Sequence, residues 1–200
     1  MRLYYFPGAC SLAPHIAACE AGLAFDIEKV DLKEKKTETG GDYTAINHKG
    51  AVPALKLDNG EVLTEVAVLL QYIAAQAPAS GLMPADGMAR WRQLELINFV
   101  ASELHKSFGP LFNPALPADA KPAFLDLIKL RLSYLEGVLG SKPYLAGDRF
   151  TAVDAYAFTI INWTKWVQID LAPWPGLVAY MERVGARPGV QRALKEEGLL

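Results

Sequence analysis

Near its start the chain reads LYYFPGACSLAPHIAACEAG (residues 3–22), and this stretch decides the expected fold. The β-rich run at residues 3–6 and the Pro-Gly turn after it predict a strand that ends just before Cys10. A helix is predicted to follow, because Ser11 is a capping residue and Gly22 marks a helix exit. A strand, a tight turn and a helix therefore place a cysteine at a helix N-terminus.

Cys10 has the surroundings of an activated thiol. Unpaired amide N–H groups and the positive end of the helix dipole both favour a thiolate there. The dipole contributes only about 0.3–1 kcal/mol, so further donors are needed for full ionisation. Cys19 lies on the opposite side of the same helix and about 13 Å along it, too far for an intrachain disulfide. We interpret Cys19 as a small packed residue.

The residues after this helix alternate between strand and helix. Residues 25–30 predict a second strand, and the polar segment 33–47 predicts a loop with one short helix. Asn59-Gly60 between residues 53–57 and 61–63 predicts an antiparallel hairpin of two strands, and residues 65–76 predict a helix. This order predicts an α/β thioredoxin-like domain over residues 1–78.

The remainder of the chain has helical patterns only. Residues 79–87 are rich in Pro and Gly and predict a linker. We expect an all-α domain over residues 88–200. Within it, Thr151 and Asp154 have the spacing of an N-terminal capping box, which predicts a helix from there through Trp166.

Composition limits the classes of function. The chain has 200 residues, of which 52% are hydrophobic, and a formal net charge of −2, which argues against nucleic acid as a partner. No apolar run approaches the roughly 18 residues of a membrane span, and no signal peptide is recognised. Two cysteines without a disulfide framework suit a reducing compartment, so we expect a cytoplasmic protein without a membrane partner. Three histidines and two cysteines show no ligand spacing, so no metal site is expected.

Several motifs occur in a specific order. They are YFPGACSLAPH (5–15), Val52-Pro53, Thr64-Glu65, SELHK (102–106) and FTAVDAY (150–156). In this combination the chain resembles the bacterial beta-class glutathione S-transferases from end to end. The resemblance implies a thioredoxin-like glutathione-binding domain, an all-helical domain and a homodimer. Glutathione is then a co-substrate, and no further cofactor is expected.

The resemblance also implies a glutathione site. Val52-Pro53 is similar to the cis-proline turn whose strand edge pairs with the cysteinyl backbone of glutathione. Glu65 would face the γ-glutamyl amino group, and Lys35 the glycine carboxylate. Val66 stands where the family usually has Gly or Ser, so we expect weaker glutathione binding. The full implied set is Cys10, Lys35, Val52, Pro53, Glu65, Val66, Asn98, Ser102, Glu103 and His105.

The first long helix after the linker carries a polar stripe. Trp91, Glu95, Asn98, Ser102 and His105 recur every three or four residues, which predicts one shared face. Without the resemblance, a solvated face with a stray histidine is the alternative. The resemblance implies that Asn98, Ser102 and His105 line the cleft. His105 would then be the further donor that Cys10 needs, which makes Cys10 and His105 the implied catalytic residues.

Four aromatic residues near this stripe suit an apolar co-substrate, although each one alone is more typical of a packed core. They are Phe108, Phe112, Trp163 and Trp166.

Three functions remain open at this point. The first is conjugation of reduced glutathione to electrophilic apolar small molecules, a detoxification reaction, with Cys10 able to form a mixed disulfide with glutathione. The second is a glutathione-dependent thiol-disulfide reductase or peroxidase that uses Cys10 as nucleophile. The third is a non-catalytic binding or ligand-storage protein.

Overall fold

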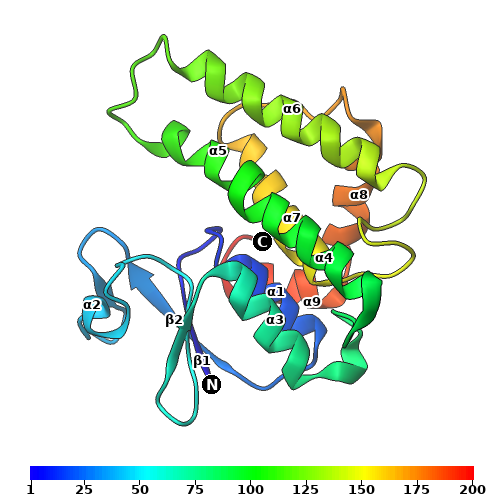
Figure 1. Ribbon diagram of the computed structural model, residues 1–200. Coiled ribbons are helices and arrows are strands. Elements are labelled where there is room, and N and C mark those ends of the chain that lie inside the picture. Colours follow the sequence, from blue (N-terminus) through cyan, green and yellow to red (C-terminus); the bar gives the residue numbers. More distant parts are fainter. The chain divides into compact units, whose positions relative to one another are not determined.

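A computed structural model describes all residues from 1 to 200, and the chain forms two compact units (Figure 1). One unit comprises Met1–Ala85 together with Ala186–Leu200, and the other comprises Asp86–Gly185. The C-terminal segment thus packs with the N-terminal residues. The domain bounds read from the sequence, with a linker at 79–87, stay a prediction.

The first unit is built on a five-stranded mixed sheet. Its strands are β1 (Arg2–Tyr5), β2 (Asp26–Asp31), β3 (Lys36–Thr37), β4 (Ala54–Lys56) and β5 (Val62–Thr64). The order across the sheet is β3-β2-β1-β4-β5, with β1 and β2 parallel and every other pair antiparallel. The predicted strands are confirmed to within one residue, and the short strand β3 is additional.

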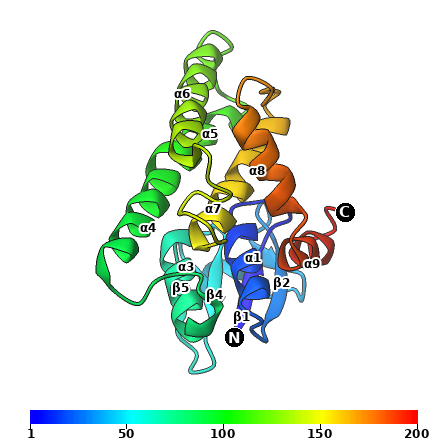
Figure 2. The same ribbon diagram turned by 90° about the vertical axis from the view of Figure 1, so that its right-hand side faces the viewer.

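The α-helices of this unit are α1 (Leu12–Glu20), α2 (Tyr43–Ile46), α3 (Val66–Gln76) and α9 (Pro188–Glu196). Helix α2 lies on one side of the sheet and α1 and α3 lie on the other (Figure 1), and α9 lies beside α1 (Figure 2). On one face of the sheet, Tyr43 of α2 packs with Tyr4, Val30 and smaller apolar side chains. On the opposite face, Leu69 of α3 packs with Leu3. Helix α1 lies against both α3 and α9. This is the predicted thioredoxin-like arrangement.

The start of α1 differs from the prediction. Ser11 does not cap the helix, because its backbone is already helical at φ −61° and ψ −20°. Its hydroxyl instead bonds to the backbone of Phe6, with 3.2 Å to the nitrogen and 3.3 Å to the oxygen. The end of the helix is as predicted, since Gly22 has a φ of 66°. Ser11 therefore closes the turn around Cys10.

A buried polar network ties this turn to the C-terminal helix. Glu197 accepts a hydrogen bond from the Gly8 amide at 2.8 Å and contacts His15 Nδ1 at 3.0 Å. Glu196 lies 2.8 Å from the other nitrogen of the same ring. Burial lowers the pKa of His15, but contacts with Cys19, Glu197 and Glu196 outweigh it and raise the value to about 10.

The second unit is all-helical, as predicted. Its elements are α4 (Gly87–Phe99), a π-helical segment (Val100–His105), α5 (Lys106–Phe108), a 3-10 turn (Gly109–Phe112), α6 (Lys121–Leu139), α7 (Ala152–Ile161), a 3-10 turn (Asn162–Lys165) and α8 (Pro175–Gly185). Helix α7 is buried along its whole length and forms the centre of this unit. None of the helices combines the length and the apolarity that crossing a bilayer requires.

The predicted capping box at the start of α7 is confirmed. Asp154 accepts hydrogen bonds from the Thr151 backbone at 2.8 Å and from its hydroxyl at 2.9 Å. The same carboxylate accepts from the Leu145 amide at 2.9 Å and the Tyr180 hydroxyl at 3.1 Å. The α-helix ends at Ile161, and the predicted continuation to Trp166 is a 3-10 turn instead.

Candidate functional site

Cys10 lies between β1 and α1, in the turn that Pro7 and Gly8 begin. Gly8 has a φ of 71°, which glycine adopts without strain, and the Ala9 amide closes the turn onto the Phe6 carbonyl at 3.0 Å. The Cys10 side chain is half-buried, and its Sγ atom lies 3.3 Å from the Val52 carbonyl oxygen, to which the thiol donates. The candidate nucleophile therefore touches the candidate binding edge.

The Val52–Pro53 peptide is cis, as the resemblance implies. Two side chains from and just after α2 hold the segment before it. The Tyr43 hydroxyl donates to the Ala51 carbonyl at 2.8 Å, and the Asn47 amide donates to the same oxygen at 2.7 Å. Burial raises the pKa of Tyr43 to about 12, against a smaller lowering by Asn47, so its hydroxyl stays a donor. No sequence pattern identified either Tyr43 or Asn47 as part of the site.

Lys35 contributes an ammonium group beside the same turn. Its Nζ atom donates to the Gly50 carbonyl at 2.8 Å, two residues before Val52. Its own backbone has a φ of 55°, the left-handed region that non-glycine residues rarely occupy.

Glu65 is not in the first turn of α3, as the sequence indicated, but precedes it. Its backbone has a φ of 72° and a ψ of 120°, and its carbonyl accepts from the Leu69 amide at 2.9 Å. Strained backbone of this kind costs on the order of 1–3 kcal/mol and concentrates at ligand sites. The Glu65 carboxylate forms an exposed ion pair with Lys49, which also donates to Thr64 at 3.0 Å. Sequence reasoning missed Lys49.

Val66 is the first residue of α3, and its side chain is buried at 5% exposure. The departure from the usual Gly or Ser therefore adds apolar packing at the helix start.

The polar stripe of the second unit is only partly as predicted. The π-helical segment Val100–His105 inserts a wider turn, so the α-helical spacing that placed five residues on one face does not hold beyond Phe99. The Ser102 hydroxyl donates to the Asn98 carbonyl at 2.9 Å, and Glu103 forms an ion pair with Arg131 at 2.6 Å. π-helical turns are frequent at functional sites, but no sequence pattern predicted this one.

His105 ends this π-helical segment. Its Nδ1 atom lies 2.9 Å from the Tyr156 hydroxyl, and its ring stands edge-on to Trp163 with 4.9 Å between centroids. These contacts fix the orientation of the imidazole. That His105 assists Cys10 stays a prediction.

The four predicted aromatic residues come together in the second unit. Trp163 stands edge-on to Phe108 and Phe112, with centroid distances of 5.8 and 5.4 Å, and stacks with Trp166 at 6.3 Å. Phe108 and Trp163 are buried, whereas Phe112 is 45% and Trp166 56% exposed. The cluster thus has a packed base and an open apolar surface.

Comparison with known proteins agrees with this arrangement. The glutathione S-transferase N-terminal domain family matches residues 8–76, and the C-terminal domain family matches residues 99–188. A curated relative, glutathione S-transferase GstA of Escherichia coli O157:H7, is 43% identical over 100% of both chains.

Solved structures match equally well. A sphingomonad glutathione S-transferase complexed with glutathione is 47% identical, with a TM-score of 0.96 over 100% of both chains. The bacterial beta-class enzyme of Sphingomonas chungbukensis gives the same identity, TM-score and coverage. The hypothesis of a non-catalytic binding or ligand-storage protein is therefore rejected, and the resemblance to the beta class is confirmed. The chain belongs to the glutathione S-transferase family and is a glutathione transferase.

Proposed function

We propose that this enzyme conjugates reduced glutathione to electrophilic apolar small molecules and that Cys10 forms a mixed disulfide with glutathione. In conjugation the glutathione thiolate attacks an electrophilic carbon, a C–S bond forms, and the leaving group departs with the bonding electron pair. The protein accelerates this step by orienting the thiolate and by offering a dry surface to the electrophile.

The proposed glutathione site begins in the first unit. The cysteinyl backbone of glutathione pairs with the edge at Val52, Lys35 takes the glycine carboxylate, and Glu65 takes the γ-glutamyl ammonium. The contact between Cys10 and Val52 supports this assignment, because it brings the thiol within reach of a sulfur bound at that edge. The sphingomonad relative with bound glutathione supports it as well. The other proposed contacts are Pro53, Val66, Asn98, Ser102, Glu103 and His105.

The open aromatic cluster is the observation that carries the choice of conjugation. Phe112 and Trp166 each leave about half of a large apolar side chain exposed above buried Trp163. Exposing aromatic surface in this way is unfavourable unless a ligand covers it. An apolar electrophile is such a ligand, whereas transfer of glutathione between thiols does not need one.

A substrate panel tests this function. Halogenated aromatics and epoxides are assayed beside mixed disulfides and hydroperoxides, in wild type and in the Phe112→Ala and Trp166→Ala variants. We expect each variant to raise KM for the aromatic electrophiles several-fold without affecting the disulfides. Leu130→Ala is the matched control, because Leu130 is 59% exposed on α6 and outside the cluster. Equal effects of all three variants would contradict the proposal.

A second candidate is a glutathione-dependent thiol-disulfide reductase or peroxidase. It is favoured by Cys10, which is half-buried and forms no disulfide with Cys19, the other cysteine of the chain. A thiolate at Cys10 would attack a mixed disulfide, take over the glutathionyl group and release the other thiol. Turnover of disulfides or hydroperoxides but not of electrophiles in the same panel selects this function.

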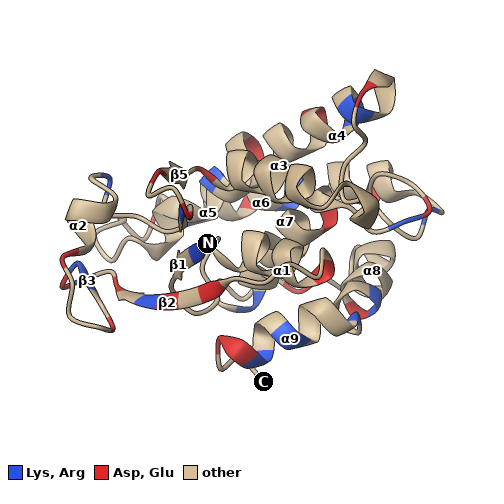
Figure 3. Cartoon of the chain, turned by 90° about the horizontal axis from the view of Figure 1, so that it is seen from below, with Lys and Arg blue, Asp and Glu red and all other residues tan.

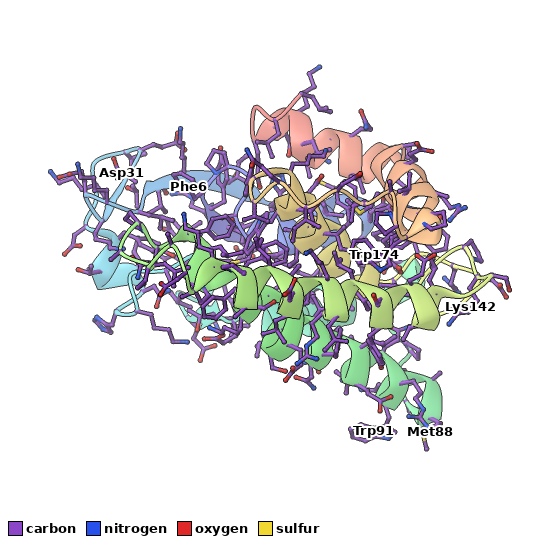
Figure 4. All side chains as sticks on the ribbon, turned by 90° about the horizontal axis from the view of Figure 1, so that it is seen from above. Phe6, Asp31, Met88, Trp91, Lys142 and Trp174 are labelled. Atoms are coloured by element: carbon purple, nitrogen blue, oxygen red, sulfur yellow. The ribbon has the colours of Figure 1, made fainter.

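We also propose that the enzyme is a cytoplasmic homodimer. The support is exposed apolar surface on α4, where Met88 is 68% and Trp91 62% exposed (Figure 4). A second copy would remove this surface from water. Light scattering at micromolar concentration is expected to give twice the chain mass, and a monomer would contradict this.

A further inference from the structure

The first unit groups three metal-ligating side chains away from the Val52 edge. His15 and Cys19 lie one helical turn apart on α1, and Glu196 ends α9. One ligand atom from each, an imidazole nitrogen, a thiol sulfur and a carboxylate oxygen, lies within 4.8 Å of the other two. The argument from the sequence that histidines and cysteines do not cluster at ligand spacing is therefore corrected. His15 and Cys19 are four residues apart in the sequence, but the third ligand, Glu196, comes from the far end of the chain.

We propose that His15, Cys19 and Glu196 bind a divalent transition metal, with zinc as the best-matched ion. Nitrogen, sulfur and one carboxylate oxygen are typical zinc ligands, at about 2.0–2.3 Å from the ion. Calcium and magnesium prefer oxygen ligands only, so the thiol disfavours them. Three ligands within 4.8 Å need only a small contraction to reach a common ion.

The second shell of the site is already in place. His15 Nδ1 lies 3.0 Å from the buried carboxylate of Glu197, which is itself fixed by the Gly8 amide at 2.8 Å. A carboxylate on one ring nitrogen fixes the orientation of a metal-binding imidazole, and a metal would take the place of the proton on the other nitrogen. That other nitrogen, Nε2, points to Glu196 at 2.8 Å. The imidazole is thus oriented as a ligand.

The remaining contacts are consistent with a partly open, three-residue site. Arg192 occupies Oε1 of Glu196 at 2.8 Å, which leaves Oε2 as a single ligand oxygen. Cys19 is half-buried and the Glu196 side chain is a third exposed, so water can complete a tetrahedron. Figure 3 shows the acidic end of α9 that carries Glu196 at the surface of the molecule. Binding releases the thiol proton of Cys19 and the proton shared between Nε2 and Glu196 to solvent.

Cobalt(II) and zinc titrations of the reduced full-length protein test this proposal. We expect one cobalt ion per chain, with a thiolate-to-cobalt charge-transfer band and the visible spectrum of tetrahedral cobalt. Zinc is expected to displace the cobalt and to raise the midpoint of thermal unfolding. Cys19→Ser should abolish the charge-transfer band, and Glu196→Gln should weaken zinc binding by about tenfold or more. Both are conservative changes at partly exposed positions, and circular dichroism checks that each variant folds.

Cys10→Ser is the matched control, since it removes the other thiol of the chain. It should leave the cobalt band and the zinc-dependent stabilisation unchanged. The proposal is overturned if wild type shows no saturable one-to-one binding. It is also overturned if the band persists in Cys19→Ser but disappears in Cys10→Ser, which would assign the metal to the thiol beside Val52.

Discussion

The Cys10 thiol donates a hydrogen bond to the carbonyl oxygen of Val52, with 3.3 Å between Sγ and O. The contact joins the turn before α1 to the segment before β4, 42 positions along the chain. A thiolate cannot donate, so ionisation of Cys10 breaks this bond. Because we propose that the cysteinyl backbone of glutathione binds the same edge, glutathione binding and the chemistry of Cys10 should be coupled.

The first prediction concerns which cysteine glutathione modifies. Treatment with oxidised glutathione should form a mixed disulfide at Cys10 and not at Cys19, because Cys10 adjoins the proposed glutathione edge and Cys19 lies near the opposite end of α1. Intact mass followed by peptide mapping measures this. An adduct mainly at Cys19 would show that exposure of the thiol, rather than the glutathione site, controls the reaction.

The second prediction concerns Val66. A serine there adds a hydroxyl donor at the start of α3 and should tighten glutathione binding by roughly 0.5–1.5 kcal/mol. The loss of buried apolar surface should lower stability at the same time, since Val66 is 5% exposed. Calorimetry and thermal unfolding measure the two effects. Val66→Thr keeps the volume and should gain affinity with a smaller loss of stability, and unchanged affinity in both variants would mean that the backbone already satisfies the ligand.

A third prediction addresses the centre of the second unit. Asp154 is fully buried and accepts hydrogen bonds from Thr151, Leu145 and Tyr180. Asp154→Ala leaves these donors without an acceptor and should lower the free energy of unfolding by about 3 kcal/mol or more. Urea denaturation measures it. Asp148→Ala, at an exposed position, is the control and should change stability by less than about 0.5 kcal/mol.

The fourth prediction concerns stability in acid. Glu28 is buried, and although burial alone raises its pKa, hydrogen bonds from Thr39, Thr37 and Arg2 lower it below the ordinary value of 4.5. A carboxyl group whose pKa is lower in the folded state stabilises the protein above its unfolded pKa, and this stabilisation is lost as pH falls through the folded value. Glu28→Gln should therefore reduce the loss of stability as the pH falls below 4.5. Denaturation midpoints across that range test this, and an unchanged pH profile would exclude Glu28 as a contributor.

Local sequence signals predicted the first unit well. The Pro-Gly turn, the Asn59-Gly60 hairpin and the helix end at Gly22 depend on the backbone preferences of single residues, so the sequence predicts them. The predicted N-cap at Ser11 was wrong because the Ser11 hydroxyl bonds to the Phe6 backbone instead of to an amide at the start of α1. The contacts that could not be predicted are those between distant segments, such as Glu197 with Gly8, because no local pattern encodes them.

The same distinction applies to the candidate site. The aromatic cluster was predicted because four large aromatic residues near the polar stripe suit an apolar co-substrate. The π-helical turn at Val100–His105 was not, since it depends on how that segment packs rather than on its own residues. The ion pair of Lys49 with Glu65 was missed for a similar reason, because it joins a loop to a helix start.

Parallel assays of conjugation and of mixed-disulfide reduction in Cys10→Ala test the central claim most directly. If glutathione's own sulfur is the nucleophile in conjugation, that activity should survive within about two orders of magnitude, under ~3 kcal/mol. Reduction of mixed disulfides should collapse, because covalent catalysis needs a thiol at this position. Cys19→Ala is the control and should retain both activities. Loss of both activities in a Cys10→Ala protein that is still folded would contradict the account and show that Cys10 itself carries the chemistry.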